Sequence, residues 1–301
     1  MPEGDTLFRT AENLRRALLG ETVTRFDSVL ESVREVDRRK GISGRVAHAV
    51  EARGKHLLIQ LRKADSWFQE GDADPIAVPE RLGLALIRSD LVLHTHLRMT
   101  GSWHIYRPGE TWHKPVKYAK CVVYTEDFVF PCFSAPVVEL LTARETARHV
   151  QLVELGPDAI TEEFSPESAL ANFRRYPDVE IGVAIMNQRL MAGVGNVFKS
   201  EVLFIRRLWP WTMIGQISDE ELMALILESH KLLKLNRGKG DRRTLFTLDD
   251  RDLQWVYGRS GKPCRACGAL IRMRRQGLDG RSTYFCPNCQ ASSDIGEGRA
   301  A

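Results

Sequence analysis

The feature that most constrains this chain is a group of four cysteines near its carboxyl end. They form two Cys-x2-Cys pairs with 18 residues between them, Cys264/Cys267 and Cys286/Cys289. Each pair makes a tight turn that directs two thiolates toward one ion, which is the spacing of a tetrahedral Zn²⁺ site. Four protein ligands leave no open position, so we predict one structural Zn²⁺ and a segment that folds as it binds the metal. The alternative, a redox pair, needs a β-α-β context that this segment lacks.

Positive charge is concentrated around these cysteines. The net charge is only +4 over 301 residues, yet residues 251–290 hold eight Lys/Arg against two Asp. Arginines on the hairpin between the two pairs suit contact with phosphates or with a DNA groove: Arg272, Arg274, Arg275 and Arg281. A solvated charged face is the other interpretation of the first three. The charge distribution therefore favours a surface that meets a polyanion.

The rest of the chain changes character near residue 142. An expected helix capped by Asp5 is followed, from Thr22 to about Leu141, by short β-type runs such as HLLIQL and LVLHTHL. Later segments, 152–192 and 217–235, carry helical periodicity. We expect an α+β multidomain protein with an N-terminal helix and antiparallel β-sandwich over 1–142, a helical domain over 143–250 and a β-hairpin zinc finger over 251–292. Residues 64–82 are expected to form a surface loop.

Nothing in the sequence predicts export or a membrane partner. The chain starts MPEGDT without a secretory leader, and it has no apolar run long enough to span a bilayer. We expect a cytoplasmic protein whose cysteines are thiols or metal ligands rather than disulfides. Cys121 and Cys132 lie in an apolar stretch and are expected to be small buried side chains.

The amino terminus offers a nucleophile. Pro2 is small enough that removal of Met1 is expected, leaving a free secondary amine. An α-amino group has a pKa of about 7.7–8.0 and a lysine one of about 10.4, so far more of the terminus is neutral at pH 7. The adjacent Glu3 can exchange protons with a substrate. Taken alone, the pattern would be that of an ordinary chain start.

Seven motifs occur in order along the chain. They are MPEGDTLFRTAENLRRALLG (1–20), RGKHLLI (53–59), HLRMTG (96–101), LGPD (155–158), NQRLMAGVGNVFKSEVLF (187–204), VYGRSGKPCRACG (256–268) and GRSTYFCPNCQ (280–290). Together they resemble the formamidopyrimidine-DNA glycosylase/endonuclease VIII family, and its actinobacterial endonuclease VIII branch in particular. The resemblance implies a monomeric, bacterial base excision repair enzyme that is both a DNA glycosylase and an AP lyase. Its partner would be damaged DNA, whether duplex, bubble or single-stranded.

The resemblance implies three catalytic residues. Pro2 would attack C1′ of the damaged nucleotide and form a Schiff base, while Glu3 would protonate the sugar and assist ring opening. Lys55, in the RGKHL turn, would contact phosphate and support catalysis. A fixed ammonium beside the scissile phosphodiester stabilises charge and positions the backbone. Without the other motifs, Lys55 would be an ordinary lysine at a hairpin tip.

The resemblance also implies four DNA-binding residues. Residues 191–199 would form a helix–two-turn–helix, in which Asn196 and Lys199 bind DNA. The finger arginine Arg281 would bind phosphate at the lesion. Met99 would fill the gap left by the extruded base, although filling the core at a strand end is an alternative role for it.

Two departures from the family pattern concern the substrate. Position 6 is Thr6, where many relatives carry a carboxylate that helps hold the flipped base. The segment after Tyr124 lacks the DxRRFG pattern of the branch that processes 8-oxoguanine. We therefore expect removal of oxidised bases, pyrimidines above all, with strand cleavage at abasic sites by β,δ-elimination. The alternative is a catalytically silent zinc-finger protein that binds damaged DNA.

Overall fold

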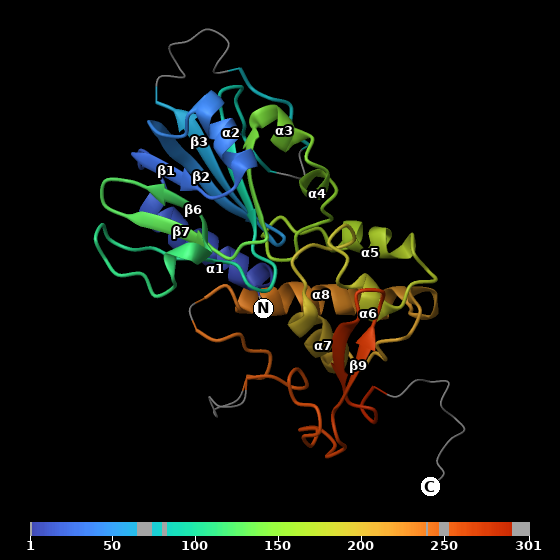
Figure 1. Cartoon of the computed structure of the whole chain (residues 1–301). Coiled ribbons are helices and arrows are strands. Elements are labelled where there is room, and N and C mark those ends of the chain that lie inside the picture. The colour runs from blue at the N-terminus through green and yellow to red at the C-terminus, as the bar shows by residue number, and fades with distance from the viewer. Residues whose placement is uncertain (1, 65–73, 80–82, 239, 247–252, 291–301) are drawn as a thin grey trace. The chain divides into compact units, whose positions relative to one another are not determined.

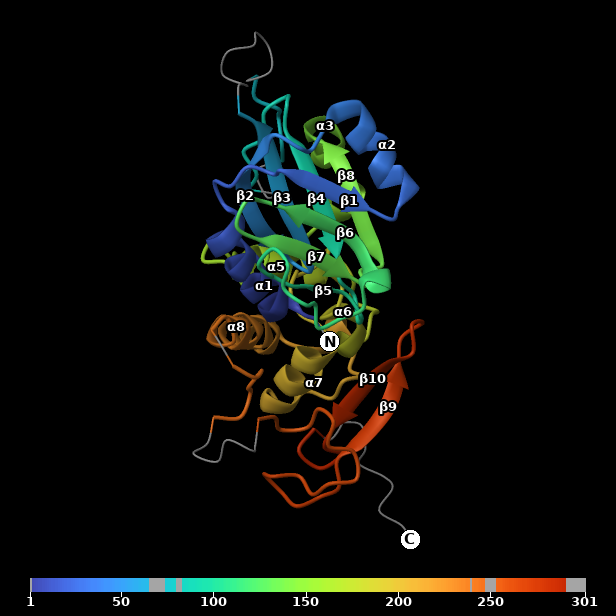
Figure 2. The same cartoon turned by 60° about the vertical axis from the view of Figure 1, so that its left-hand side comes forward.

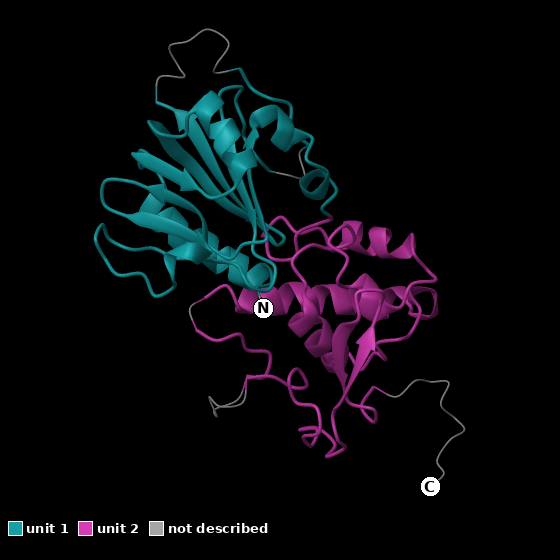
Figure 3. Ribbon diagram, viewed as in Figure 1, with its two compact units in different colours: residues 1–155 teal, residues 156–301 magenta. Residues whose placement is uncertain are grey.

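The chain folds into two compact units. The structure, a computed structural model, describes residues 2–64, 74–79, 83–238, 240–246 and 253–290. The units are residues 1–155 and 156–301 (Figure 3). Helices α3 (Ala143–Ala147) and α4 (Val150–Val153), expected in a helical domain, belong to the first unit. The second unit holds the helices that follow α4, together with the finger. Most of the loop expected at 64–82 lies outside the described residues.

The first unit begins with helix α1 (Gly4–Leu18). Its apolar face is buried as predicted, because Leu7, Ala11, Leu14 and Leu18 are each at most 1% exposed. The expectation that Asp5 caps this helix is wrong. Glu3 is the N-cap residue, and Asp5 lies in the first turn, where a carboxylate interacts favourably with the helix dipole.

Two four-stranded antiparallel sheets follow and enclose one apolar core between them (Figures 1 and 2). This arrangement confirms the predicted antiparallel β-sandwich. One sheet has the order β1-β6-β7-β5 and the other β2-β3-β4-β8. The strands are β1 (Arg25–Ser28), β2 (Arg45–Arg53), β3 (His56–Lys63), β4 (Leu91–His96), β5 (Ser102–Trp103), β6 (Ala119–Tyr124), β7 (Val129–Phe133) and β8 (Val137–Thr142), with the short helix η2 (Val116–Tyr118) before β6.

The β2-β3-β4-β8 sheet is covered on both faces. Side chains alternate along a strand, so Leu57 and Ile59 of β3 enter the core between the sheets while Leu58 points to the other side. There it packs with Leu86 and Leu152 in a second apolar layer. Polar side chains on this second face are therefore held away from bulk water.

Helix α2 (Glu31–Lys40) was not expected, because its sequence lies within the stretch that we assigned to strands. Only Val33 among its residues is buried. Val33 and Val36 are its only apolar residues, so its apolar stripe is too short to stand out among the charged side chains of the sequence.

The second unit combines helices with a hairpin. The expected helix at 217–235 is α8 (Asp219–Leu235), which Ser218 and Glu221 begin with a capping box. The other elements are α5 (Pro166–Arg174), α6 (Ile181–Ala184), α7 (Asn196–Ile205), the short helix η3 (Ile214–Gln216), and the hairpin strands β9 (Arg272–Gln276) and β10 (Arg281–Phe285). In the part of the chain that the structure describes, no helix combines the length and apolar character needed to cross a bilayer.

Candidate functional site

The two residues singled out at the amino terminus lie directly before α1. Pro2 is partly exposed, and Glu3 is fully buried. Glu3 has extended backbone angles, and its carbonyl oxygen accepts a hydrogen bond from the Leu7 backbone N–H at 3.0 Å, which opens the helix. Its side chain therefore belongs to the positive end of a helix, where a negative charge is stabilised.

Lys55 occupies the two-residue turn between β2 and β3, as the sequence suggested. Gly54 has φ 56° and takes the first central position, which a type II′ hairpin reserves for glycine. Lys55 is partly exposed and lies close to the imidazole of His96. Burial, together with the positive charge of Lys55, lowers the pKa of His96 to about 4. This imidazole is therefore neutral at neutral pH.

Met99 is presented to solvent. It lies in the turn after β4, and 67% of its surface is exposed. The turn is closed by a hydrogen bond of 2.8 Å from the Gly101 N–H to the Leu97 carbonyl. A Cβ at Gly101 would lie 2.7 Å from the Leu97 backbone, so glycine is required for this closure. The alternative in which Met99 fills the core is wrong.

A row of imidazoles that the sequence analysis missed lies on the second face of the β2-β3-β4-β8 sheet. His56 Nδ1 lies 2.8 Å from His94 Nε2, and the rings of His56 and His96 are in edge contact at 4.7 Å. Two histidines spaced by two in the strand LVLHTHL were the available signal, because residues i and i+2 of a strand share a face.

Asn196 is the first residue of α7 and is 4% exposed. Its side-chain amide donates to Ser282 Oγ of β10 at 2.8 Å. Its Oδ1 is buried and has no hydrogen-bond partner within the described residues. The structure therefore brings Asn196 into contact with the finger hairpin.

Lys199 has a different place from the one expected. It is fully buried, and its ammonium donates to Thr283 Oγ1 at 2.8 Å and to the Ser282 carbonyl at 3.1 Å. These contacts fix helix α7 to strand β10. The position favours support of the hairpin over direct contact with DNA.

The four cysteines of the finger converge as their spacing predicted. Their sulfur atoms all lie within 4.8 Å of one another, with 3.5 Å between Cys267 and Cys286 and 3.9 Å between Cys264 and Cys289. A tetrahedron with Zn–S bonds of about 2.3 Å has edges of about 3.8 Å. The donor set fits one structural Zn²⁺.

Arg281 begins strand β10 and its side chain is 44% exposed. It lies 3.6 Å from the carboxylate of Asp279. Of the finger arginines, Arg274 stacks on the Trp211 ring at 4.6 Å. Arg281 is thus placed on an accessible part of the hairpin.

Glu201 is a buried carboxylate of α7 that the sequence did not single out. It accepts hydrogen bonds from the backbone N–H groups of Trp255, Val256 and Tyr257 at 2.7–2.9 Å. These contacts fix the start of the finger to the helix.

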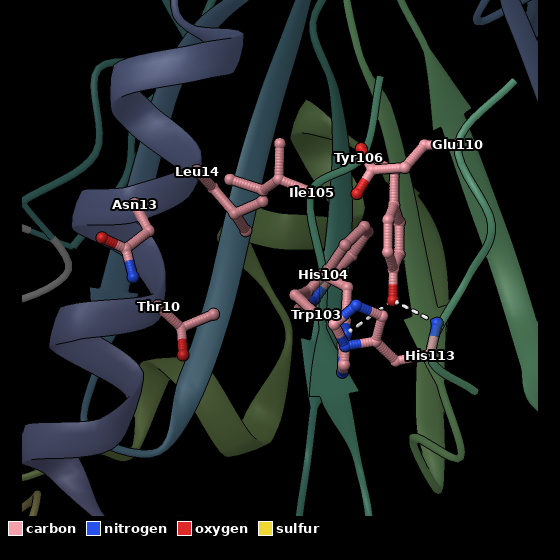
Figure 4. Close-up of a pocket in the computed structure, with 9 residues that line it drawn as sticks. All are labelled: Thr10, Asn13, Leu14, Trp103, His104, Ile105, Tyr106, Glu110 and His113. Carbon is pink, nitrogen blue, oxygen red and sulfur yellow. Dashed lines mark hydrogen bonds between the residues drawn. The ribbon is translucent and has the colours of Figure 1, made fainter. Parts of the chain in front are cut away.

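A pocket of about 280 Å³ in the first unit contains none of the predicted site residues (Figure 4). It lies between α1 and residues 103–113. Inside it, the Tyr106 hydroxyl accepts from the His113 backbone N–H at 3.0 Å and pairs with His104 Nδ1 at 3.0 Å. These hydrogen bonds fix the residues that line the pocket on the side opposite α1.

Three family models match successive stretches of the chain. Residues 1–134 match the formamidopyrimidine-DNA glycosylase N-terminal domain, and residues 155–242 match the H2TH domain of the same glycosylase. Residues 261–291 match the zinc finger found in FPG and IleRS. The predicted helix–two-turn–helix and zinc finger are confirmed.

Two bacterial relatives are similar over nearly their whole length. "Probable endonuclease 8 2" of Streptomyces coelicolor is 36% identical, over 97% of this chain and 94% of that protein. "DNA-(apurinic or apyrimidinic site) lyase Nei2" of Mycolicibacterium smegmatis is 34% identical, over 97% of this chain and all of that protein.

Solved structures agree on the fold. Lactococcus lactis Fpg (MutM) in complex with DNA containing N7-benzyl-Fapy-dG has a TM-score of 0.73 at 20% identity, covering 97% of this chain and 100% of that one. The same protein bound to DNA with an AP site gives a TM-score of 0.74.

Proposed function

Because this chain belongs to the formamidopyrimidine-DNA glycosylase/endonuclease VIII family, we propose that Pro2 is the nucleophile of an endonuclease VIII-type DNA glycosylase/AP lyase in base excision repair. The observation that carries the proposal is the arrangement at the start of α1. Pro2 is accessible, and the buried carboxylate Glu3 follows it. A nucleophile beside a shielded acid is the pair that displacement of a base requires.

Water is the one further reactant that the chemistry needs. The nitrogen lone pair of Pro2 attacks C1′, and the bond from C1′ to the base breaks. The base takes the electron pair of that bond and the proton that the Pro2 nitrogen loses. Glu3 donates a proton to the sugar ring oxygen as the ring opens to the iminium ion. The iminium acidifies C2′–H, so loss of that proton expels the 3′ phosphate. A second elimination expels the 5′ phosphate, and water releases Pro2.

Charged and polar side chains would hold the DNA backbone around the lesion. Lys55, partly exposed at the β2–β3 turn, and Arg281, exposed on the finger, are the cations that we assign to phosphates. Asn196 would donate to a phosphate from its side-chain NH2, which carries two N–H groups and gives one of them to Ser282 Oγ. The exposed thioether of Met99 suits filling of the space left by the extruded nucleotide. Zn²⁺ would keep the finger folded and takes no part in the reaction.

Oxidised pyrimidines are the proposed substrates. The segment after Tyr124 is a tight hairpin between β6 and β7, closed by a 2.9 Å hydrogen bond from the Thr125 N–H to the Phe128 carbonyl. It supplies no arginine to enter the duplex opposite the lesion. A lesion panel offered in duplex, bubble and single-stranded DNA tests this preference. Faster excision of 8-oxoguanine than of oxidised pyrimidines in every context would overturn it.

Covalent trapping tests the nucleophile. Borohydride reduction in the presence of an abasic oligonucleotide should link DNA to the first peptide of the Met-processed protein. Pro2 preceded by one residue that cannot be removed should give no adduct, since the nitrogen is then an amide. Unchanged strand cleavage by the extended protein would show that Pro2 is not the nucleophile.

A matched lysine pair tests the role of Lys55. Lys55→Met should slow cleavage of an abasic site, by about 100-fold if the ammonium acts like other preorganised electrostatic groups. Lys63→Met, at the other end of β3, removes the same charge and should leave the rate unchanged. Equal rates for the two variants would argue against the assignment.

A catalytically silent damage-binding module is the second candidate. It is favoured only by the basic finger hairpin, which would bind DNA without the amine chemistry. It predicts salt-sensitive binding of damaged DNA without a trapped adduct.

A further inference from the structure

A second group of metal-ligating side chains lies in the first unit, on the covered face of the β2-β3-β4-β8 sheet. Glu139 Oε2 lies 2.8 Å from His94 Nδ1 and 3.1 Å from His149 Nε2. His94 is fully buried, the His149 side chain is 18% exposed and the Glu139 side chain 40%. The proposed repair chemistry uses none of the three.

Strand pairing and a helix start create this group. His94 of β4 stands directly opposite Glu139 of β8 in the antiparallel register. His149 is the N-cap residue of α4, which follows β8 after the short α3. The three side chains thus come from three segments of one unit, and a bound ion would tie those segments together.

We propose that His94, Glu139 and His149 bind one divalent transition-metal ion, with Zn²⁺ the best match, at a site separate from the finger. Two imidazole nitrogens and one carboxylate oxygen are the donors Zn²⁺ accepts when one position is left for water. The three ligand atoms lie within 4.8 Å of one another. With Zn–ligand bonds of about 2.1 Å, a tetrahedral edge is about 3.4 Å, so the Glu139 contacts with His94 and His149 need to lengthen by about 0.6 and 0.3 Å from 2.8 and 3.1 Å.

His56, the neighbour of His94, is placed to support His94 as a metal ligand. His94 Nε2 lies 2.8 Å from His56 Nδ1, which is buried on the adjacent strand β3. A metal on His94 Nδ1 requires the proton on Nε2, and His56 is placed to accept that hydrogen bond.

Cobalt distinguishes this site from the finger. Co²⁺ titrated into the full-length, zinc-loaded protein should bind with a stoichiometry of one per chain. Ligand-field bands in the visible spectrum should appear without the near-ultraviolet thiolate-to-cobalt charge transfer that a site of four thiolates gives. Zn²⁺ added afterwards should displace the cobalt, and metal analysis should then find two zinc ions per chain.

Three variants locate the bound ion. His149→Gln should abolish the visible bands, and His56→Gln should weaken cobalt binding by about 10- to 100-fold, as loss of an outer hydrogen-bond partner does. His113→Gln, an exposed histidine elsewhere in the same unit, is the matched control and should bind as the parent does. If His149→Gln fails to fold, Glu139→Gln replaces it with a side chain of nearly equal volume.

The proposal fails if cobalt gives only thiolate charge transfer, because the finger is then the one site occupied. It also fails if folded His149→Gln or Glu139→Gln retains the visible bands. Equal weakening by His113→Gln and His149→Gln would indicate surface binding alone. None of these readouts depends on DNA cleavage, so the repair activity can fail its own tests without affecting this result.

Discussion

The finger of the second unit and the covered sheet face of the first both gather metal-ligating side chains, but they are built in different ways. In the finger, each pair of ligands is separated by two residues, and the second pair returns through the β9–β10 hairpin. On the sheet face, His94 and Glu139 meet because two strands pair in one register. A shift of that register by one residue would place them on opposite faces.

The two regions should therefore respond differently when ligands are lost. The finger has a small apolar cluster around Val256 and Ile271, so the metal supplies much of its order. The sheet face rests on the apolar core of the sandwich, which is made of residues other than these ligands. The finger site can be recognised from the spacing of its cysteines, but its structure depends on the metal. The sheet-face site cannot be recognised from the sequence, but its side chains are held in place by the fold.

Removal of zinc should give the largest effect. Structural Zn²⁺ contributes about 10–16 kcal/mol to the folding of small fingers. A strong chelator, or Cys286→Ser, should abolish amide-exchange protection over residues 253–290 and leave β3 and β4 protected. Loss of protection in both units would contradict the independence of the sandwich core.

Asp90→Ala should be the most damaging change on the covered sheet face. The fully buried Asp90 carboxylate accepts two hydrogen bonds of 2.8 Å from Arg62 and one of 2.9 Å from the Ile87 N–H. Removal leaves a buried guanidinium without its counter-ion, which costs about 3–5 kcal/mol. Urea denaturation followed by amide exchange should show the loss in the first unit only, with the finger amides as the control.

Variants of two basic residues of the second unit should distinguish a side chain that contacts DNA from one that only supports the hairpin. Arg281→Ala removes an exposed cation, so the dependence of log Kd on log salt should fall by about one unit. Lys199→Met removes a buried ammonium, so it should lower stability and leave that slope unchanged. A reduced slope for Lys199→Met would restore it as a phosphate contact.

The smallest effect should come from Glu162, which is fully exposed and pairs with Lys234 and Arg237 near the end of α8. Hydrogen bonds from these cations lower the pKa of Glu162 to about 2, below its ordinary value of 4.5. The stabilisation is complete above pH 4.5 and is lost as the pH falls toward 2. Glu162→Gln should therefore lower the urea midpoint slightly at pH 6 and not at all near pH 2.

Individual residues show which features of the structure could be predicted from the sequence. The buried face of α1 followed from apolar side chains at helical spacing, and helix α8 followed from the periodicity of residues 217–235. The helix α2 did not, because Val33 is its only buried residue. The sequence left two roles open for Met99, in DNA binding and in the core. The turn that ends at Gly101 places its side chain in solvent.

What the sequence by itself determined was local: the four-cysteine finger, the Pro2–Glu3 start and the ordered motifs that establish the family. Such features depend on spacing along the chain, which folding does not alter. Only the tertiary structure decided that Lys199 is buried against β10 and that His94 faces Glu139. Both depend on contacts between segments far apart in the chain, since burial and strand register are properties of the packed fold.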